Sequence, residues 1–237
     1  MDHFVIIRFS VIFNNRPELK TNNIFNKERL DFRFNLFEKY CLPSLVKQSV
    51  IDYKIIIIYD KNLPQEYKNK LYNLTSCYNF IILHQWNIKD SLVKNDWLKP
   101  YYTNNNDFII TTRIDDDMIN YNLNKNFKNY INRYYCENYI ISFQGAHFLK
   151  NDNDLEIFKV NYKSLSVFLS KISLKNDVNI YGHSHDNINY NRRIIKMNNC
   201  FIQFNHKFEN DNRFERFAKK SSKKITLFEM NKLLEFI

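Results

Sequence analysis

Glycine is almost missing from this sequence of 237 residues, which has only Gly145 and Gly182, far apart. A Walker phosphate loop, a dinucleotide-binding Gly-x-Gly-x-x-Gly turn and a kinase glycine loop all need clustered glycines where the backbone approaches phosphate. The sequence therefore excludes all three. A nucleotide bound by this chain must be held by side chains and a metal ion.

Paired cysteines and long hydrophobic runs are missing as well. The four cysteines are far apart, which excludes a Cys-x-x-Cys zinc or redox motif and indicates reduced thiols. The longest aliphatic run, Ile55–Ile58, is far shorter than the roughly 20 residues of a membrane span. Asp2 also stands where a signal peptide needs positive charge. We therefore expect a cytoplasmic protein. The cysteines are Cys41, Cys77, Cys136 and Cys200.

Charge of one sign is in excess, with 35 Lys and Arg against 25 Asp and Glu, a formal net charge of +10. One interpretation is a genome with AT-rich codons, since Asn, Ile, Lys, Tyr and Phe are all abundant. The other is an acidic partner, such as a nucleotide diphosphate, a membrane surface or a nucleic acid. Composition leaves both open.

Short runs of Ile, Val and Phe alternate with helical patterns, which predicts an α/β fold. One domain is expected over residues 1–212, followed by a basic, amphipathic helical tail over 213–237 that packs on it. The predicted strands are His3–Arg8, Tyr53–Tyr59, Asn79–His84, Phe108–Thr112, Tyr139–Phe143 and Cys200–Phe204. The predicted helices are Glu28–Gln48 with a bend or end near Pro43, one that begins at Pro64, Ser91–Trp97, Ser164–Ile172 and Ile225–Phe236.

Three consecutive acids, Asp115, Asp116 and Asp117, follow the predicted strand Phe108–Thr112. Like charges this close raise one another's pKa, so the cluster is costly unless a positive charge lies there. In an extended segment Asp115 and Asp117 point to the same side and can both present oxygens to Mg²⁺ or Mn²⁺. The alternative is an acidic turn neutralised by Arg113 and solvent.

Further polar residues stand where predicted strands end. Arg8 and Arg113 lie at carboxyl ends of strands, where open α/β sheets bind ligands, and can pair with phosphate or with the Asp cluster. Asp60 closes another strand and can accept from a base or ribose, or serve as a cap or turn residue.

The segment Tyr181–Asp186 contains candidates for a general base. Asp186 beside His185 is a carboxylate next to an imidazole, a pair whose pKa can be tuned toward the working pH. Gly182 would allow the backbone to turn sharply there. A polar loop without catalytic role explains the same residues.

Four stretches, in this order along the chain, resemble the putative rhamnosyltransferase family, which are glycosyltransferases of A-type fold. The resemblance implies a transferase that moves a sugar, rhamnose or glucose, from a nucleotide-sugar donor to a glycan or another hydroxyl acceptor. The stretches are Arg8-Phe9, the Arg-x-x-Leu-Phe-Glu and Cys-Leu-Pro-Ser-Leu pattern within Arg33–Ser49, the segment Thr111–Asp117 with its Asp-x-Asp, and Phe201–His206 with the later Asn212-Arg213.

The resemblance also implies site residues. His206 would join Asp115 and Asp117 as a third ligand of Mn²⁺ or Mg²⁺, although by itself it reads as an ordinary histidine. The basic and apolar residues of the tail, by themselves, predict a helix that packs on the domain or makes peripheral contact with a membrane. A basic α/β nucleic-acid-binding module without catalysis is the alternative, but it leaves the acid triad unexplained. The expected nucleotide-sugar-binding residues are Arg8, Asp60, Arg113, Asp115 and Asp116, and the expected catalytic residues are Asp186 and His185.

Overall fold

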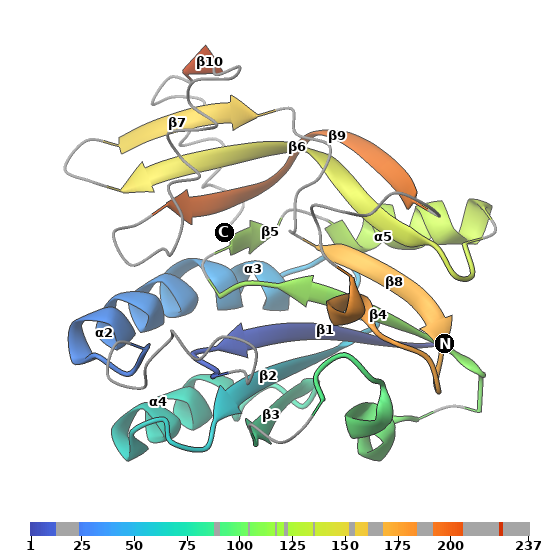
Figure 1. Cartoon of the computed structure of the whole chain (residues 1–237). Helices are drawn as coiled ribbons and strands as arrows, with labels where there is room; N and C mark the ends of the chain where they lie inside the picture. The colour runs from blue at the N-terminus through green and yellow to red at the C-terminus, as the bar shows by residue number, and fades with distance from the viewer. Residues whose placement is uncertain are drawn as a thin grey trace.

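The computed structural model (Figure 1) has the predicted α/β class, with strands and helices that alternate through the first half of the chain. Within the part it describes, no helix is both long and apolar enough to cross a membrane. The described residues are 1–12, 24–87, 91–103, 105–116, 118–120, 123–134, 136–151, 155–160, 168–183, 192–205 and 223–224.

A mixed β-sheet forms the centre of the fold. Four parallel strands lie in the order β3-β2-β1-β4, and β8 continues the sheet antiparallel to β4. Beyond β8 come β6, β7 and β10, while β9 pairs with β6 and with the short β5. The strands are β1 (Asp2–Phe9), β2 (Lys54–Asp60), β3 (Ile81–Trp86), β4 (Phe108–Ile114), β5 (Met118–Asn120), β6 (Ile140–Asn151), β7 (Leu155–Val160), β8 (Leu169–Leu174), β9 (Arg192–Asn205) and β10 (Lys223–Lys224).

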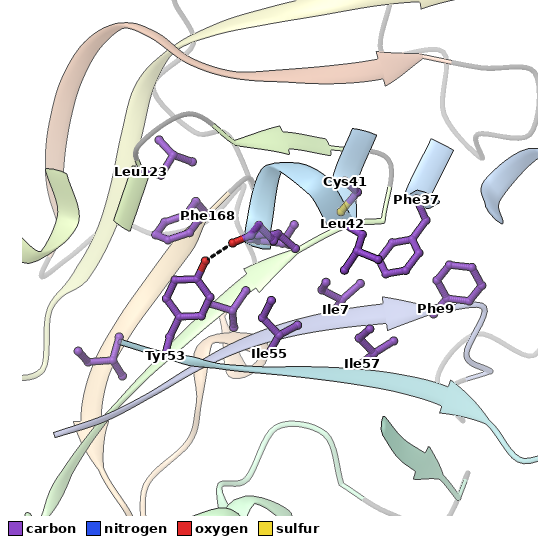
Figure 2. Close-up of a cluster of buried hydrophobic side chains, with 14 of the residues drawn as sticks. Ile7, Phe9, Phe37, Cys41, Leu42, Tyr53, Ile55, Ile57, Leu123 and Phe168 are labelled. Atoms are coloured by element: carbon purple, nitrogen blue, oxygen red, sulfur yellow. Dashed lines mark hydrogen bonds between the residues drawn. The ribbon is translucent and has the colours of Figure 1, made fainter. Parts of the chain in front are cut away.

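Helices cover one face of the parallel strands, because alternate strand residues on that face are apolar. Val5, Ile7 and Phe9 of β1 pack with side chains of α2, α3, α4 and α5 in one buried cluster. Figure 2 shows Phe37 and Leu42 of this helical layer above Ile7 and Phe9. The elements are α2 (Lys27–Leu36), the π-helical η1 (Phe37–Cys41), α3 (Leu42–Val46), α4 (Gln65–Thr75) and α5 (Leu123–Arg133).

The other face of the sheet carries a second apolar cluster. Phe4 and Ile6 of β1 pack there against Trp86 and against Leu98 of the 3₁₀ helix η2 (Asp96–Tyr101). Tyr181, from the 3₁₀ turn η3 (Ile180–Gly182), borders the same cluster. Side chains at even positions of β1 therefore face η2 and η3, and those at odd positions face the helices.

Two of the predicted helices are wrong where the structure describes them. Of the expected helix Ser164–Ile172, the part from Leu169 onward is strand β8, whose backbone pairs with β4 and β6 on its two sides. Tertiary pairing decides such short apolar runs rather than their spacing. The expected helix Ser91–Trp97 is instead η2, which starts at Asp96 and includes Pro100. The expected helix Ile225–Phe236 lies outside the described residues.

The sheet has its switch point beside β1. The chain passes from β1 to β2 on one side, and β4 then pairs on the other side of β1. In open α/β sheets, ligands bind beyond the carboxyl ends of the two strands at which the order reverses. In this fold those ends are Phe9 and Ile114.

Candidate active site

The carboxyl ends of β1 and β4 bring Arg8 and Asp115 together. The parallel register pairs Ile6 with Arg113 and Ile7 with Ile114, so that Arg8 lies level with the first acid of the triad. A guanidinium N–H of Arg8 donates to Oδ1 of Asp115 at 3.1 Å. Of the two roles expected for Arg8, the structure shows the ion pair with the Asp cluster.

Asp115 is held in its ionised form. Burial raises the pKa of its carboxyl, but Arg8 and Arg113, with a smaller effect from Arg33, outweigh burial and lower the pKa to about 2. The side chain is 26% exposed, so one part of it reaches solvent. This exposed part of the carboxylate can meet a ligand.

Asp116 points the other way, into the helical layer. Its carboxylate accepts from Nε of Arg33 at 2.8 Å and from a terminal nitrogen of the same guanidinium. Only 1% of the Asp116 side chain and 14% of the Arg33 side chain are exposed. The thiol of Cys41 also reaches the backbone carbonyl of Asp115, at 3.8 Å. The helical layer thus fixes the turn that follows β4.

Tyr181 lies against both arginines of the site. Its ring centre is 5.1 Å from the guanidinium carbon of Arg8 and 5.4 Å from that of Arg113. The hydroxyl donates to the backbone carbonyl of Ile6 at 3.2 Å. Burial raises the pKa of Tyr181 although both arginines lower it, so the hydroxyl stays a neutral donor. Sequence reasoning did not single out Tyr181, although it opens the segment taken as a source of the base.

Asp60 organises the loops beside this site. It is 3% exposed, and its two oxygens accept from the backbone N–H groups of Ile12 at 3.1 Å and Asn62 at 2.8 Å. Ser10 follows β1 with a left-handed φ of 51°, and its hydroxyl accepts from Arg29 at 3.1 Å. Asp60 therefore acts as a turn residue in this structure, and its contact with a base or ribose stays a prediction.

The described residues contain no group of three or more His, Cys, Asp or Glu side chains that could hold a metal ion. Two of the expected ligands, Asp117 and His206, lie outside the described part of the chain. Among the expected ligands that the structure describes, Asp115 fits the chemistry of Mg²⁺ or Mn²⁺, because its ionised, partly exposed carboxylate offers hard oxygen. The backbone pairing of Met118 with Gln203 brings the strand just after Asp117 beside the strand that leads to His206.

The candidate bases Asp186 and His185 also lie outside the described residues. Their neighbour His183 is described: burial, followed by Lys171, lowers its pKa, so that it is neutral near pH 7. At Gly182 the backbone is not left-handed. A Cβ atom there would lie 3.0 Å from side-chain atoms of Val93 and Val178, so lack of space, rather than a sharp turn, favours glycine.

Structural comparison finds loose similarity to several solved proteins. S. aureus TarS in complex with UDP-GlcNAc matches at a TM-score of 0.46 and 12% identity, over 93% of this chain and 61% of that chain. HddC from Yersinia pseudotuberculosis matches at a TM-score of 0.41 and 14% identity, over 93% of this chain and 100% of HddC. Mouse xyloside xylosyltransferase 1 matches at a TM-score of 0.36 and 12% identity, over 61% of this chain and 53% of that chain. The chain thus spans less than two thirds of TarS.

Sequence comparison gives the family. A search of curated proteins finds no significant match. The family model described as putative rhamnosyl transferase matches residues 2–216, a span that contains every described site residue. The resemblance carried by the Arg33–Ser49 and Thr111–Asp117 stretches is confirmed by this match. The chain belongs to the putative rhamnosyl transferase family, a family of glycosyltransferases.

Proposed function

We propose that this chain is a metal-dependent glycosyltransferase of A-type fold, which moves a sugar from a nucleotide-sugar donor to a hydroxyl of a glycan or another acceptor. The observation that carries the proposal is the meeting of Arg8, Arg113 and the ionised Asp115 at the switch point of the sheet. The family description favours rhamnose as the sugar, with glucose as the other candidate.

The reaction requires charge stabilisation on the donor side. The bond between the anomeric carbon and the phosphate oxygen breaks, and its electron pair stays on the leaving diphosphate. We propose that Arg8 and Arg113 pair with these oxygens as negative charge develops. A divalent cation held by Asp115, with Asp117 and His206 as further ligands, would supply additional positive charge there.

On the acceptor side, the hydroxyl oxygen forms the new bond to the anomeric carbon and gives up its proton to a base. We propose Asp186, tuned by His185, for this base. Asp60 and Asp116 complete the proposed donor site, Asp60 through the loop beside Arg8 and Asp116 through the turn that carries Asp115. We also propose a cytoplasmic location, which the free thiols of Cys41, Cys77 and Cys136 support.

A thermal-shift screen tests the proposal. The protein is heated with UDP-, GDP- and dTDP-sugars, each with and without Mn²⁺, because a ligand that binds the folded state raises the unfolding temperature. We expect one nucleotide class to stabilise the protein, and to do so only with the cation. A donor that stabilises the protein is then incubated with acceptors to detect released nucleotide diphosphate. No response to any nucleotide sugar would contradict the proposal.

A further inference from the structure

The arginines of the site share one aromatic ring, and this arrangement has an electrostatic cost. Arg8 and Arg113 carry like charges, and both guanidinium carbons lie within 5.4 Å of the ring centre of Tyr181. Asp115 accepts a hydrogen bond from Arg8 and neutralises one of the two charges. The negative face of an aromatic ring attracts a guanidinium, so Tyr181 stabilises both cations where they would otherwise repel each other.

The ring itself is firmly held. The hydroxyl of Tyr181 is bonded to the carbonyl of Ile6, and its backbone N–H donates to Oδ1 of Asn179 at 2.9 Å. Asn179 is fully buried, and its amide donates to the carbonyls of Leu92 at 2.7 Å and Lys94 at 3.1 Å. A buried amide with its donors and acceptor satisfied fixes the turn in one conformation.

The strand below the turn anchors it a second time. The backbone N–H of Ile180 donates to the hydroxyl of Thr111 in β4 at 3.1 Å, and both residues are fully buried. Gly182 lies so close to Val93 and Val178 that a side chain would push the turn away. The ring of Tyr181 is therefore placed before any ligand arrives, at the same sheet edge as Asp115.

We propose that Tyr181 is a positioning residue, whose ring holds Arg8 and Arg113 together as a cradle for the diphosphate of the donor. The inference rests on the proposed function. It explains how Arg8 keeps its place when Asp115 is drawn toward a cation or when phosphate oxygens replace the carboxylate. Pre-placed donors lose less freedom on binding, so the cradle contributes affinity for the diphosphate.

Inorganic pyrophosphate with Mg²⁺ is a probe for the cradle alone, measured by titration calorimetry on the full chain. Tyr181→Phe keeps the ring but removes the hydroxyl, which is bonded to the carbonyl of Ile6 and to Arg8. We therefore expect a modest loss of affinity, about threefold. Tyr181→Leu removes the ring, and we expect binding to weaken by about tenfold, since two cation–π contacts are lost. As a matched control, Tyr139→Leu removes the ring just before β6 whose centre lies 4.5 Å from the guanidinium carbon of Arg193 in β9. This variant should leave pyrophosphate affinity unchanged.

A double-mutant cycle separates positioning from a general structural role. If the ring acts through the arginines, Tyr181→Leu should cost little more affinity once Arg8 and Arg113 are both changed to Gln. An equal loss in both backgrounds would overturn the inference. If thermal unfolding shows that Tyr181→Leu is unfolded, Tyr181→Met takes its place in the same cycle.

The outcomes keep the two proposals apart. A wild type that binds neither pyrophosphate nor any nucleotide sugar contradicts the proposed function. A wild type that binds pyrophosphate as tightly as the Tyr181→Leu variant overturns only the role of Tyr181. A loss of affinity that is larger for Tyr181→Leu than for Tyr181→Phe, with Tyr139→Leu near the wild type, supports the cradle.

Discussion

The ion pair between Arg33 and Asp116 gives the sharpest test of how the acid turn is built. Asp116 is 1% exposed and accepts two hydrogen bonds from a guanidinium that is 14% exposed. Changing Arg33 to Gln leaves this carboxylate buried without its counter-charge. Loss of one partner from a buried pair costs about 3–5 kcal/mol. For a domain of this size, that loss corresponds to a fall of about 6–20 °C in unfolding temperature.

Urea unfolding followed by circular dichroism and by tryptophan fluorescence measures this free energy. The matched control lies on the same helix: Lys27→Gln breaks the pair of Lys27 with Asp31, whose side chains are 75% and 53% exposed. Water already screens that pair, so its loss should hardly move the midpoint. A combined Arg33→Met and Asp116→Leu variant should recover most of the stability, because no unpaired charge stays buried.

The stabilities of Arg33→Gln and Lys27→Gln, compared with each other, test whether Asp116 is buried and paired with Arg33. An Arg33→Gln protein as stable as Lys27→Gln would show that Asp116 is not buried and paired as described. An Arg33→Gln protein that is destabilised, together with a stable double variant, would support the pair. Activity of the stable double variant then reports whether the turn needs these charges or only needs to be filled.

Three further predictions concern charge. Asp115→Asn should abolish the Mn²⁺-dependent thermal stabilisation by the donor nucleotide and lower transfer at least about a hundredfold; unchanged Mn²⁺ dependence would contradict the metal site. Burial, with Lys128 second, holds the pKa of His3 well below 6.5, so the unfolded chain takes up a proton first as pH falls. The free energy of unfolding should therefore fall between pH 7 and pH 5 by up to about 1.4 kcal/mol per pH unit. Urea titrations at several pH values should show a weaker pH dependence for His3→Phe than for the wild type, and an equal dependence would refute this. Nucleic-acid binding, measured by fluorescence anisotropy, should be weak at physiological salt, because net charge alone gives salt-sensitive affinity; tight binding without any response to nucleotide sugars would favour the binding module.

The parallel part of the sheet could be predicted because its strands are continuous apolar runs. Ile55–Ile58 is buried on both faces of β2, as such a run indicates. Helix α5 was not predicted, since Leu123–Arg133 is rich in Asn and Lys, which hide the helical spacing of Leu123, Phe127 and Tyr130. Strand β8 was mistaken for a helix because its pairing partners are distant in sequence.

The site could be predicted only in part, for the same reason. Local rules place Arg8, Asp60 and Asp115 at strand ends, and the structure puts each of them there. These local rules do not predict which side chain or backbone group each of the three residues binds. The guanidinium of Arg33 and the ring of Tyr181 come from segments 83 residues before Asp116 and 173 residues after Arg8, and only the folded chain brings them together.

The charges at the switch point also bear on the basic composition of the chain. Arg8, Arg33 and Arg113 face Asp115 and Asp116 there, so these five side chains carry one net positive charge. Both carboxylates are hydrogen-bonded to guanidinium groups, and their negative charge therefore does not repel a phosphate as a free acid cluster would. Together with a divalent cation, these charges can attract a diphosphate to this edge. The overall +10 is then not required for donor binding, and its cause can be sought elsewhere in the composition.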